Sequence, residues 1–396
     1  MRAAGRVYRV AVDGAAEVPA QLLRDVSAIA EAEARIAGAP PYRRYLVLVH
    51  LADGLGRMAA LEHAASTSII APHRAFHGAS GGEAYTELLY VIAHELFHAW
   101  NARRLRPAEM VPLDFARPML SRSLWITEGL TEYYAHRALR AAGKWSRARY
   151  LERLGEEATR AVAAARLGLT IEEQAELAWQ APDEAALDPD AYYARGHLVA
   201  LALDARIRAL TDGARSLDDV LRALLADADR AGGVLPVDGE VLARAVGRIA
   251  PGAAGDVAAW TRAPGEPARL RDALASLGLG LATEELPART VAGFSAEPDG
   301  DSLRVALVTP SGPAARAGLR PGDRIVLIGG AQPTPKWANA IAQKSPGAAL
   351  VIEAVRAARR MVVELRLDAT RQLICRVIES PAPPRATSLR DALLGR

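Results

Sequence analysis

Two histidines in the stretch HELFHAWN, residues 94–101, have the residue types and the spacing of a metal site. A helix rotates by about 100° per residue, so His94 and His98 would lie on one face of a helix, close enough to bind one ion. Glu95 would lie beside them, where its carboxylate could reach a metal-bound water without being a ligand. The alternative is that these residues form the polar face of an ordinary helix.

A third protein ligand has to come from another element. The stretch LWITEGLTEYYAHRALRAAG, residues 124–143, has the pattern of a second amphipathic helix, with Glu128 in its first turn and Glu132 one turn later. Two histidines and one glutamate leave the fourth position of zinc open for water or substrate, as in catalytic rather than structural sites. Glu132 could hydrogen-bond the outer nitrogen of a ligand histidine and fix its tautomer, or it could be a charge that faces solvent.

These side chains are positioned by a chain of 396 residues, which is longer than one core usually supports, so two or three domains are expected. Residues 1–82 mix strand and helix patterns, and residues 83–264 are helical almost throughout. We therefore predict a catalytic domain over residues 1–264 with a strand-rich lobe and a helical lobe. The individual predictions are strands at 8–12, 45–51 and 60–70, a helix at 18–36, and capping boxes at 170–173 and 216–219.

The composition changes near residues 263–270, and beyond them short strand patterns alternate with turn residues. Residues 265–370 are predicted to form a small β-rich domain, a size typical of an independent module. Residues 371–396 are predicted to be a Pro-containing C-terminal tail that lies loosely over the surface.

The bulk composition excludes several classes of protein. A net charge of +3 on a chain of this length gives a weak mean field, and no Lys/Arg tract is interleaved with aromatic residues, so nucleic-acid binding is not indicated. The single cysteine, Cys375, excludes a disulfide framework and a Cys-based zinc cluster. No apolar run is long enough for a membrane span or a signal peptide. The chain as given is expected in the cytoplasm, or in the periplasm or outside the cell if an N-terminal region is missing.

Three separated motifs occur in the chain: HELFHAWNARRLRPAEM from His94, LWITEGLTEYY from Leu124 and YYARGHLVALALDARIRAL from Tyr192. Together they resemble the glycyl aminopeptidase family of zinc peptidases, thermolysin-like gluzincins with a C-terminal PDZ domain. The resemblance extends from about Tyr8 to about Leu367. It implies an α+β fold and one zinc ion per chain, with a ligand set and a general base that fall on the residues already singled out: His94, His98 and Glu128 as zinc ligands, and Glu95 as general base.

The third motif supplies a further candidate for catalysis. YARG at 193–196 resembles the Tyr-x-Lys-Gly motif of related aminopeptidases, whose tyrosine stabilises the oxyanion. The resemblance gives that role to Tyr193 and places Arg195 in the lysine position. A phenol hydroxyl is a sensible donor to a developing negative charge. The alternatives are that Tyr192 has this role, or that Tyr193 is a buried helix aromatic.

The stretch MAALEHAAS at 58–66 resembles the family's Gly-Gly-Leu-Glu-His strand, the sheet edge along which substrate lies. The resemblance makes Ala60, Glu62 and His63 substrate-binding residues. A peptide added to such an edge gains main-chain hydrogen bonds, and Glu62 could then pair with the free α-amino group of the substrate. Ala59 and Ala60 replace the two glycines, which is costly only if a positive φ is needed there. The alternative for Glu62 is a structural role in the strand.

The β-rich domain is similar to the PDZ pattern of bacterial proteases, through GLRPGDRIVLIGG at 318–330. VAGFSA at 291–296 stands where the carboxylate-binding loop would be, with Gly293 and Phe294 in the peptide groove. Such a domain binds a C-terminal peptide, or it only packs against the catalytic domain. Members of the family usually carry an N-terminal β domain ahead of the region where this chain begins.

The sequence therefore predicts a zinc-dependent aminopeptidase that hydrolyses N-terminal peptide bonds of peptides with a free N-terminus. By resemblance, the preferred first residue is small, Gly or Ala. The alternatives are a zinc endopeptidase of the same fold and a catalytically silent scaffold whose working part is the PDZ domain.

Overall fold

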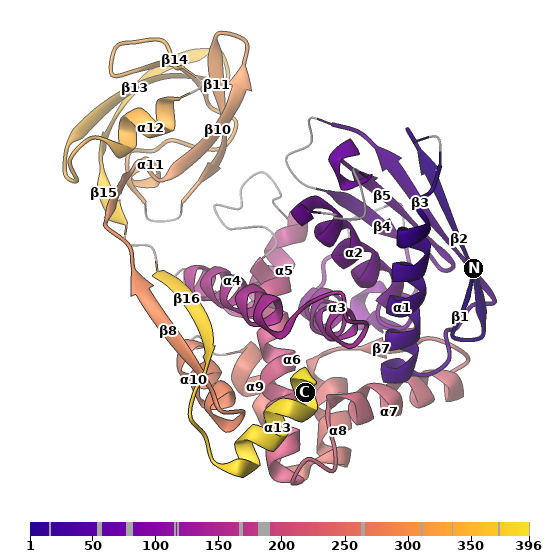
Figure 1. The fold of residues 1–396 in the computed structure, drawn as a ribbon. Helices are drawn as coiled ribbons and strands as arrows, with labels where there is room; N and C mark the ends of the chain where they lie inside the picture. The colour runs from indigo at the N-terminus through magenta and orange to yellow at the C-terminus, as the bar shows by residue number, and fades with distance from the viewer. Residues whose placement is uncertain are drawn as a thin grey trace.

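The computed structural model describes residues 1–15, 17–53, 58–76, 82–114, 116, 119–165, 169–180, 191–262, 266–309, 312–334, 336–370 and 373–395. Within these residues the chain is of mixed α and β structure, as predicted (Figure 1).

The N-terminal lobe is a five-stranded sheet in the order β1-β2-β3-β5-β4 (Figure 1). Strands β2, β3 and β5 are parallel, and β4 pairs antiparallel with β5 at the edge. In β3 the alternate residues Tyr45, Val47 and Val49 are buried, as the two-residue period of a strand requires. The elements of this lobe are β1 Arg2–Ala3, β2 Arg6–Asp13, α1 Ala20–Ala37, β3 Arg44–Leu51, β4 Ala59–Glu62, β5 Ser66–Ala71 and a 3-10 turn at His73–Phe76.

The single strand predicted at 60–70 is wrong, because the chain turns back within it. β4 ends at Glu62, β5 begins at Ser66, and the amide of His63 donates to the carbonyl of Ser66 at 2.8 Å. The alternation of a strand cannot reveal a hairpin whose turn contains only His, Ala and Ala. The consequence is that β4 becomes the free edge of the sheet.

The helical lobe is built around α6, which is buried on almost its whole circumference. A helix that is buried all round belongs in the centre of a bundle, and the other helices surround it (Figure 1). Its buried charges are paired, as in Arg208 with Asp204. Both predicted capping boxes are present: Ser216 with Asp219 at α7, and Thr170 with Glu173 at α5. The elements are α2 Gly82–Phe97, α3 Leu130–Ala141, α4 Arg147–Ala165, α5 Ile171–Gln180, α6 Ala191–Leu210, α7 Leu217–Arg230, α8 Gly239–Ile249, α9 Asp256–Thr261, α10 Glu266–Ser276, the parallel strands β6 Leu105–Pro107 and β7 Leu235–Val237, and 3-10 turns at Ala108–Met110 and Pro251–Ala253.

A second hydrophobic core lies in the β-rich unit, which stands apart from the helical lobe in Figure 1. Its five-stranded antiparallel sheet has the order β10-β11-β12-β13-β14. The core is formed by apolar residues from Ala292 to Leu367. The elements are β9 Arg289–Val291, β10 Phe294–Asp299, β11 Ser302–Val308, α11 Pro313–Arg316, β12 Arg324–Ile328, α12 Trp337–Ala342, β13 Ala349–Arg356, β14 Arg359–Arg366 and β15 Asp368–Thr370.

The C-terminal residues do not form the loose tail that the sequence predicts. Strand β16 Leu373–Glu379 pairs antiparallel with β8 Leu279–Glu285, and α13 Pro384–Leu394 packs on the helical lobe (Figure 1). Leu389, Leu393 and Leu394 are buried in the first core, so the apolar side of α13 explains why it docks. The helix α10 and the start of β8 belong to the same core, so the β-rich unit is inserted between β8 and β16.

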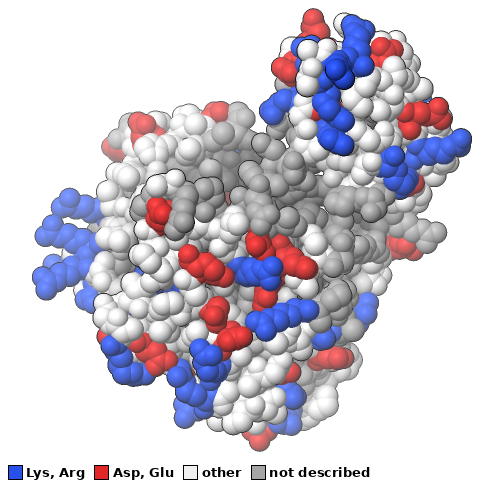
Figure 2. All heavy atoms as spheres, turned by 180° about the vertical axis from the view of Figure 1, so that it is seen from behind, with Lys and Arg blue, Asp and Glu red and all other residues white. Residues whose placement is uncertain are grey.

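Acidic and basic side chains are interspersed on the face of the molecule shown in Figure 2. Among the described residues, no helix combines the length and the apolar composition needed to cross a membrane.

Candidate active site

Helix α2 and the residue that follows it carry the predicted metal site. His94 and Glu95 lie in the last turn of α2, and His98 follows directly, its amide bonded to the carbonyl of His94 at 3.3 Å. All three residues are nearly inaccessible to solvent, with exposures of 3 to 7%. The alternative of a polar helix face exposed to solvent is therefore excluded by the structure.

Three atoms from two elements converge at this point. The Nε2 atoms of His94 and His98 are 3.0 Å apart, and Oε2 of Glu128 lies 3.1 Å from the first and 3.3 Å from the second. Ligand atoms about 2 Å from a tetrahedral zinc are separated by about 3.3 Å. The donor set and its spacing therefore fit a zinc ion with one position left open.

The charges at this cluster point the same way. Burial alone would raise the pKa of Glu128, but the charge of His98 and hydrogen bonds from both histidines lower the pKa to about 2. Burial would lower the pKa of His98, yet the Glu128 carboxylate raises it to about 10. Protons on the histidines therefore balance the negative charge of Glu128 in this cluster. A divalent cation can supply that positive charge in place of the protons.

A short π-helix, Trp125–Gly129, positions Glu128, where the sequence predicted the first turn of a regular helix. Its Gly129 is in contact with Gly196 of α6: a Cβ added at Gly129 would lie 2.3 Å from Cα of Gly196, and one added at Gly196 would lie 2.4 Å from the carbonyl oxygen of Trp125. Only two glycines allow these backbones to approach so closely. This contact sets the helix that carries Tyr193 against the segment that carries Glu128.

Asn101, which the sequence analysis did not single out, holds the site together. Its backbone carbonyl accepts a hydrogen bond from Nδ1 of His98 at 3.0 Å, so a neutral His98 carries its proton on Nδ1 and offers Nε2 as a metal ligand. Its side-chain amide nitrogen donates to the carbonyl of Ile126 at 2.9 Å and to that of Thr127 at 2.8 Å. The sequence offered a signal for this role, because Asn101 lies three residues after His98 in the HELFHAWN stretch.

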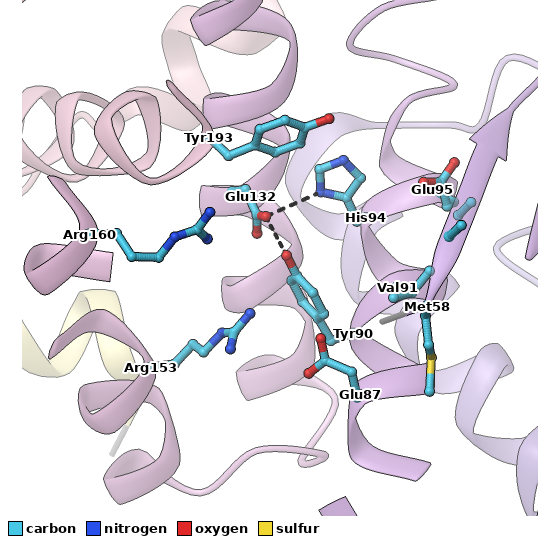
Figure 3. Close-up of a pocket in the computed structure, with 12 residues that line it drawn as sticks. Met58, Glu87, Tyr90, Val91, His94, Glu95, Glu132, Arg153, Arg160 and Tyr193 are labelled. Carbon is cyan, nitrogen blue, oxygen red and sulfur yellow. Dashed lines mark hydrogen bonds and ion pairs between the residues drawn. The ribbon is translucent and has the colours of Figure 1, made fainter. Parts of the chain in front are cut away.

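Glu132 is buried and lies beside His94, but less closely than the sequence predicted. Its Oε1 is 3.9 Å from Nδ1 of His94, which is an ion-pair distance and not a hydrogen bond. Oε1 accepts instead from the hydroxyl of Tyr90 (Figure 3). Oε2 lies 3.4 Å from Nε2 of His136. The solvent-facing alternative is excluded, and Glu132 links the site to a buried His136, Glu157 and His197 group.

Glu95 points into the cleft from the other side of the histidines (Figure 3). Its Oε2 is 3.3 Å from the hydroxyl of Thr67 on β5. Burial raises the pKa of Glu95, and the nearby charges of His98 and His94 lower it in part. A carboxylate poised in this way can accept and return a proton. Thr67 is a contact that the sequence did not reveal.

Tyr193 lies over the ring of His94, with ring centroids 5.8 Å apart and an interplanar angle of 28° (Figure 3). It lines both cavities that flank the histidines, whereas Tyr192 lines one of them. Tyr193 is partly exposed, which excludes the buried-aromatic alternative. Arg195 is not at the site: it is buried, and it donates to Gln174 at 2.7 Å and to the carbonyl of Leu169 at 2.9 Å.

Edge strand β4 runs past the histidines and borders two cavities of about 420 and 430 Å³. Ala59 and Ala60 line the first, and Glu62 lines the second. Neither alanine has a positive φ, so the replacement of glycine is harmless here. Among the residues that the structure describes, no strand pairs with the outer side of β4, so its backbone is open to pairing.

Glu62 faces the second cavity but already has a partner. Arg103 lies 3.3 Å from its carboxylate and also donates to its backbone carbonyl. A substrate amine at Glu62 would share that carboxylate with the guanidinium. His63 lies beyond the end of β4, in the turn to β5, and lines neither cavity.

The β-rich unit has a groove of about 670 Å³ between its β9-β10 segment and α12. Gly293 has a φ of 75°, and a Cβ there would lie 2.8 Å from Cδ of Pro313. Phe294 stacks on Trp337 with ring centroids 4.9 Å apart. Both residues predicted for the peptide groove line this cavity.

Residues 87–199 match the model of the M61 glycyl aminopeptidase family, and residues 304–356 match that of the PDZ domain. No curated protein matches the chain in sequence. The crystal structure of an aminopeptidase N family protein from Idiomarina loihiensis is similar over 100% of this chain and 69% of that chain, with a TM-score of 0.77 and 23% identity.

Two other solved structures overlap with parts of the chain. An M1 zinc metallopeptidase from Deinococcus radiodurans covers 64% of this chain and 47% of its own, with a TM-score of 0.37 and 18% identity. A serine endoprotease from Yersinia pestis covers 21% and 30%, with a TM-score of 0.19 and 22% identity. The chain therefore carries a peptidase region similar to the M61 glycyl aminopeptidase family, followed by a region similar to the PDZ domain.

Proposed function

We propose that this peptidase is a zinc-dependent aminopeptidase that releases small N-terminal residues, Gly or Ala. The observation that carries the proposal is the triangle of His94, His98 and Glu128 atoms with edges of 3.0 to 3.3 Å. Glu95 and Tyr193 flank this triangle in the same cleft. When bound there, zinc would act as a Lewis acid and lower the pKa of a water toward 7.

The residues of the chain carry out the remaining steps. Glu95 takes the proton of the attacking water and later returns it to the leaving amine. Tyr193 donates a hydrogen bond to the oxyanion that forms at the carbonyl. The open edge of β4 aligns the peptide main chain, and Glu62 at its end receives the α-amino group.

A panel of amino-acid arylamides, assayed with and without a chelator, tests the proposal. Turnover of the Gly and Ala substrates, its loss with chelator and its return with stoichiometric zinc are the expected results. Metal analysis of the purified protein should give one zinc per chain. Protein without zinc and without turnover would contradict the proposal and favour the scaffold alternative.

One observation favours a second candidate, an endopeptidase that uses the same chemistry. Arg103 already neutralises Glu62 in part, so the amine anchor is weaker than an unpaired carboxylate would be. N-terminally acetylated peptides separate the two functions: an aminopeptidase cleaves them far more slowly than the free amines. In an endopeptidase, Glu62→Ala would have little effect on either substrate.

The PDZ groove would serve as a separate binding site for a C-terminal peptide. The supporting features are the positive φ of Gly293, which allows a tight turn at the cavity wall, and the aromatic wall of Phe294. Fluorescence titration with a library of carboxy-terminal peptides, with amidated peptides as controls, measures such binding. Equal affinity for the amidated peptides would contradict a carboxylate-binding groove.

A further inference from the structure

Two arginines of α4 face the first cavity, on the side of the histidines away from Glu62. Arg153 and Arg160 are seven residues apart, which places them on the same face of the helix. Both line the cavity with Tyr193, His94 and Glu95, and Figure 3 shows both side chains extending from α4 into it. The family resemblance assigned no role to either residue.

Arg153 is held in a defined position within the cavity wall. Its guanidinium lies 5.0 Å from the ring centroid of Tyr90 and 3.0 Å from Glu156. Glu87 also lines this cavity, and burial, the largest effect, raises the pKa of its carboxyl. Arg153 and Arg160 share this cavity with the carboxyls of Glu87 and Glu132 and keep their positive charge, so this end of the cleft offers guanidinium donors to a ligand.

The course of β4 shows which part of a substrate would reach these arginines. Met58 and Ala59, at the start of the strand, line the cavity of Arg153 and Arg160, whereas Glu62, at its end, lines the other cavity. A peptide whose amine lies at Glu62 would pass the histidines and continue toward the start of β4. The part of the peptide beyond the scissile bond would then enter the cavity of Arg153 and Arg160.

We propose that Arg153 and Arg160 form a subsite for a carboxylate on the leaving side of the scissile bond. The inference rests on the proposed aminopeptidase function and specifies its substrates: short peptides whose own C-terminal carboxylate lies within two residues of the scissile bond, or peptides with an acidic side chain there. An extended chain advances about 3.3 Å per residue, so both kinds of carboxylate come within the reach of an arginine side chain. Guanidinium groups bind carboxylates through paired, charge-assisted hydrogen bonds.

The test compares substrates that differ by one charge. We would measure kcat/KM for Ala-Ala and Ala-Ala-Ala against their C-terminal amides, and for Ala-Asp-amide against Ala-Asn-amide. The wild-type enzyme should prefer the charged member of a pair by roughly 10- to 100-fold, the range of a hydrogen bond between charged groups. The first two pairs report the C-terminal carboxylate, and the third reports an acidic side chain.

In the variants Arg160→Gln and Arg153→Gln, the ratio of kcat/KM for the charged substrate to that for the uncharged one should fall toward one. Arg160→Lys should retain part of the preference for the charged substrate. Because each ratio is measured within one variant, a general loss of activity cancels. Arg149→Gln is the matched control: Arg149 is also on α4, its side chain is also 20% exposed, and it pairs with Glu83 and Glu152 outside the cavity. Its ratio should equal that of the wild type.

Arg106 provides the test of direction, because it lines the other cavity beside Arg103. A ratio that falls in Arg106→Gln and not in Arg160→Gln would overturn the inference. Equal kcat/KM values for both members of every pair in the wild type would also overturn the inference. If the enzyme still hydrolysed the amides, the proposed function would remain intact. Failure to hydrolyse any arylamide or peptide would overturn the proposed function, and the inference with it.

Discussion

The peptidase cleft and the PDZ groove both lie beside the open edge of a sheet, β4 in the first and β10 in the second. They differ in what surrounds that edge. The cleft gathers buried and half-buried ionisable groups from α2, the π-helix and α6. The PDZ groove is bounded by a glycine turn and a stacked aromatic pair. Chemistry requires many long-range polar contacts, whereas recognition of a peptide end can be built from local backbone and apolar surface.

The largest effect on turnover, and so the clearest difference between the cleft and the groove, is expected from Glu95→Gln. The amide cannot accept the proton of the attacking water, so kcat should fall by about 10²- to 10⁴-fold. Zinc content should not change, because His94, His98 and Glu128 are untouched, and binding of peptides to the PDZ groove should not change either. Metal analysis and arylamide kinetics measure both. A Gln variant with wild-type turnover would show that another group is the base.

Tyr193→Phe should have the next largest effect. Removal of one donor to an oxyanion costs about 2 to 4 kcal/mol of transition-state stabilisation, mostly in kcat. The phenyl ring keeps the contact with His94, so the fold should be unaffected. Tyr192→Phe is the control, since Tyr192 lines the second cavity but not the first. An unchanged kcat in Tyr193→Phe, with a loss in Tyr192→Phe, would transfer the role to Tyr192.

Gly196→Ala tests whether the cleft depends on the close contact of two backbones. The added Cβ would lie 2.4 Å from the Trp125 carbonyl, and overpacking of this kind costs roughly 1 to 3 kcal/mol or more. Calorimetry should show a lower melting temperature for the peptidase domain, with the unfolding of the PDZ core unchanged. Gly255→Ala is the control, because a Cβ there meets no atom within 4 Å. Equal stability of the two variants would refute the importance of the contact.

The smallest effect is expected from Phe294→Ala in the PDZ groove. Loss of the stack on Trp337 should destabilise that unit by about 0.5 to 1.5 kcal/mol beyond the burial lost, and leave arylamide turnover unchanged. Denaturant unfolding followed by tryptophan fluorescence would measure the change. Val362→Ala, at an exposed position of β14, is the control. A change in turnover would show that the peptidase cleft and the PDZ groove are coupled, and the two could then not be treated as independent sites.

The sequence predicted the parts of the cleft that depend on short spacings. His94 and His98 are four residues apart and Glu128 and Glu132 likewise, so helical geometry alone placed each pair on one face. It did not predict Asn101 as a bridge to the segment before Glu128, nor Thr67 beside Glu95, because such contacts depend on how distant elements pack. The hairpin at His63 was missed because no turn residue marks it.

The β-rich unit shows the same limit at the scale of a domain. Its strands were predicted from local alternation, and its core is separate, as expected. The return of the chain as β16 and α13 was not predicted, because Pro381, Pro383 and Pro384 gave the segment the composition of a loose tail. Pro384 instead lies at the start of α13, where a missing backbone N–H costs nothing.

The pairing of β8 with β16 has a practical consequence for protein engineering. A truncation after residue 370 would not yield an isolated peptidase domain, because it would remove Cys375, Val377 and Leu393 from the first core. Glu285 and Leu373 are directly paired across the two strands. A two-residue Asn-Gly turn between them could replace the whole intervening unit and close the strands as a hairpin. Such a deletion would provide the enzyme without its PDZ unit and with both anchoring strands in place.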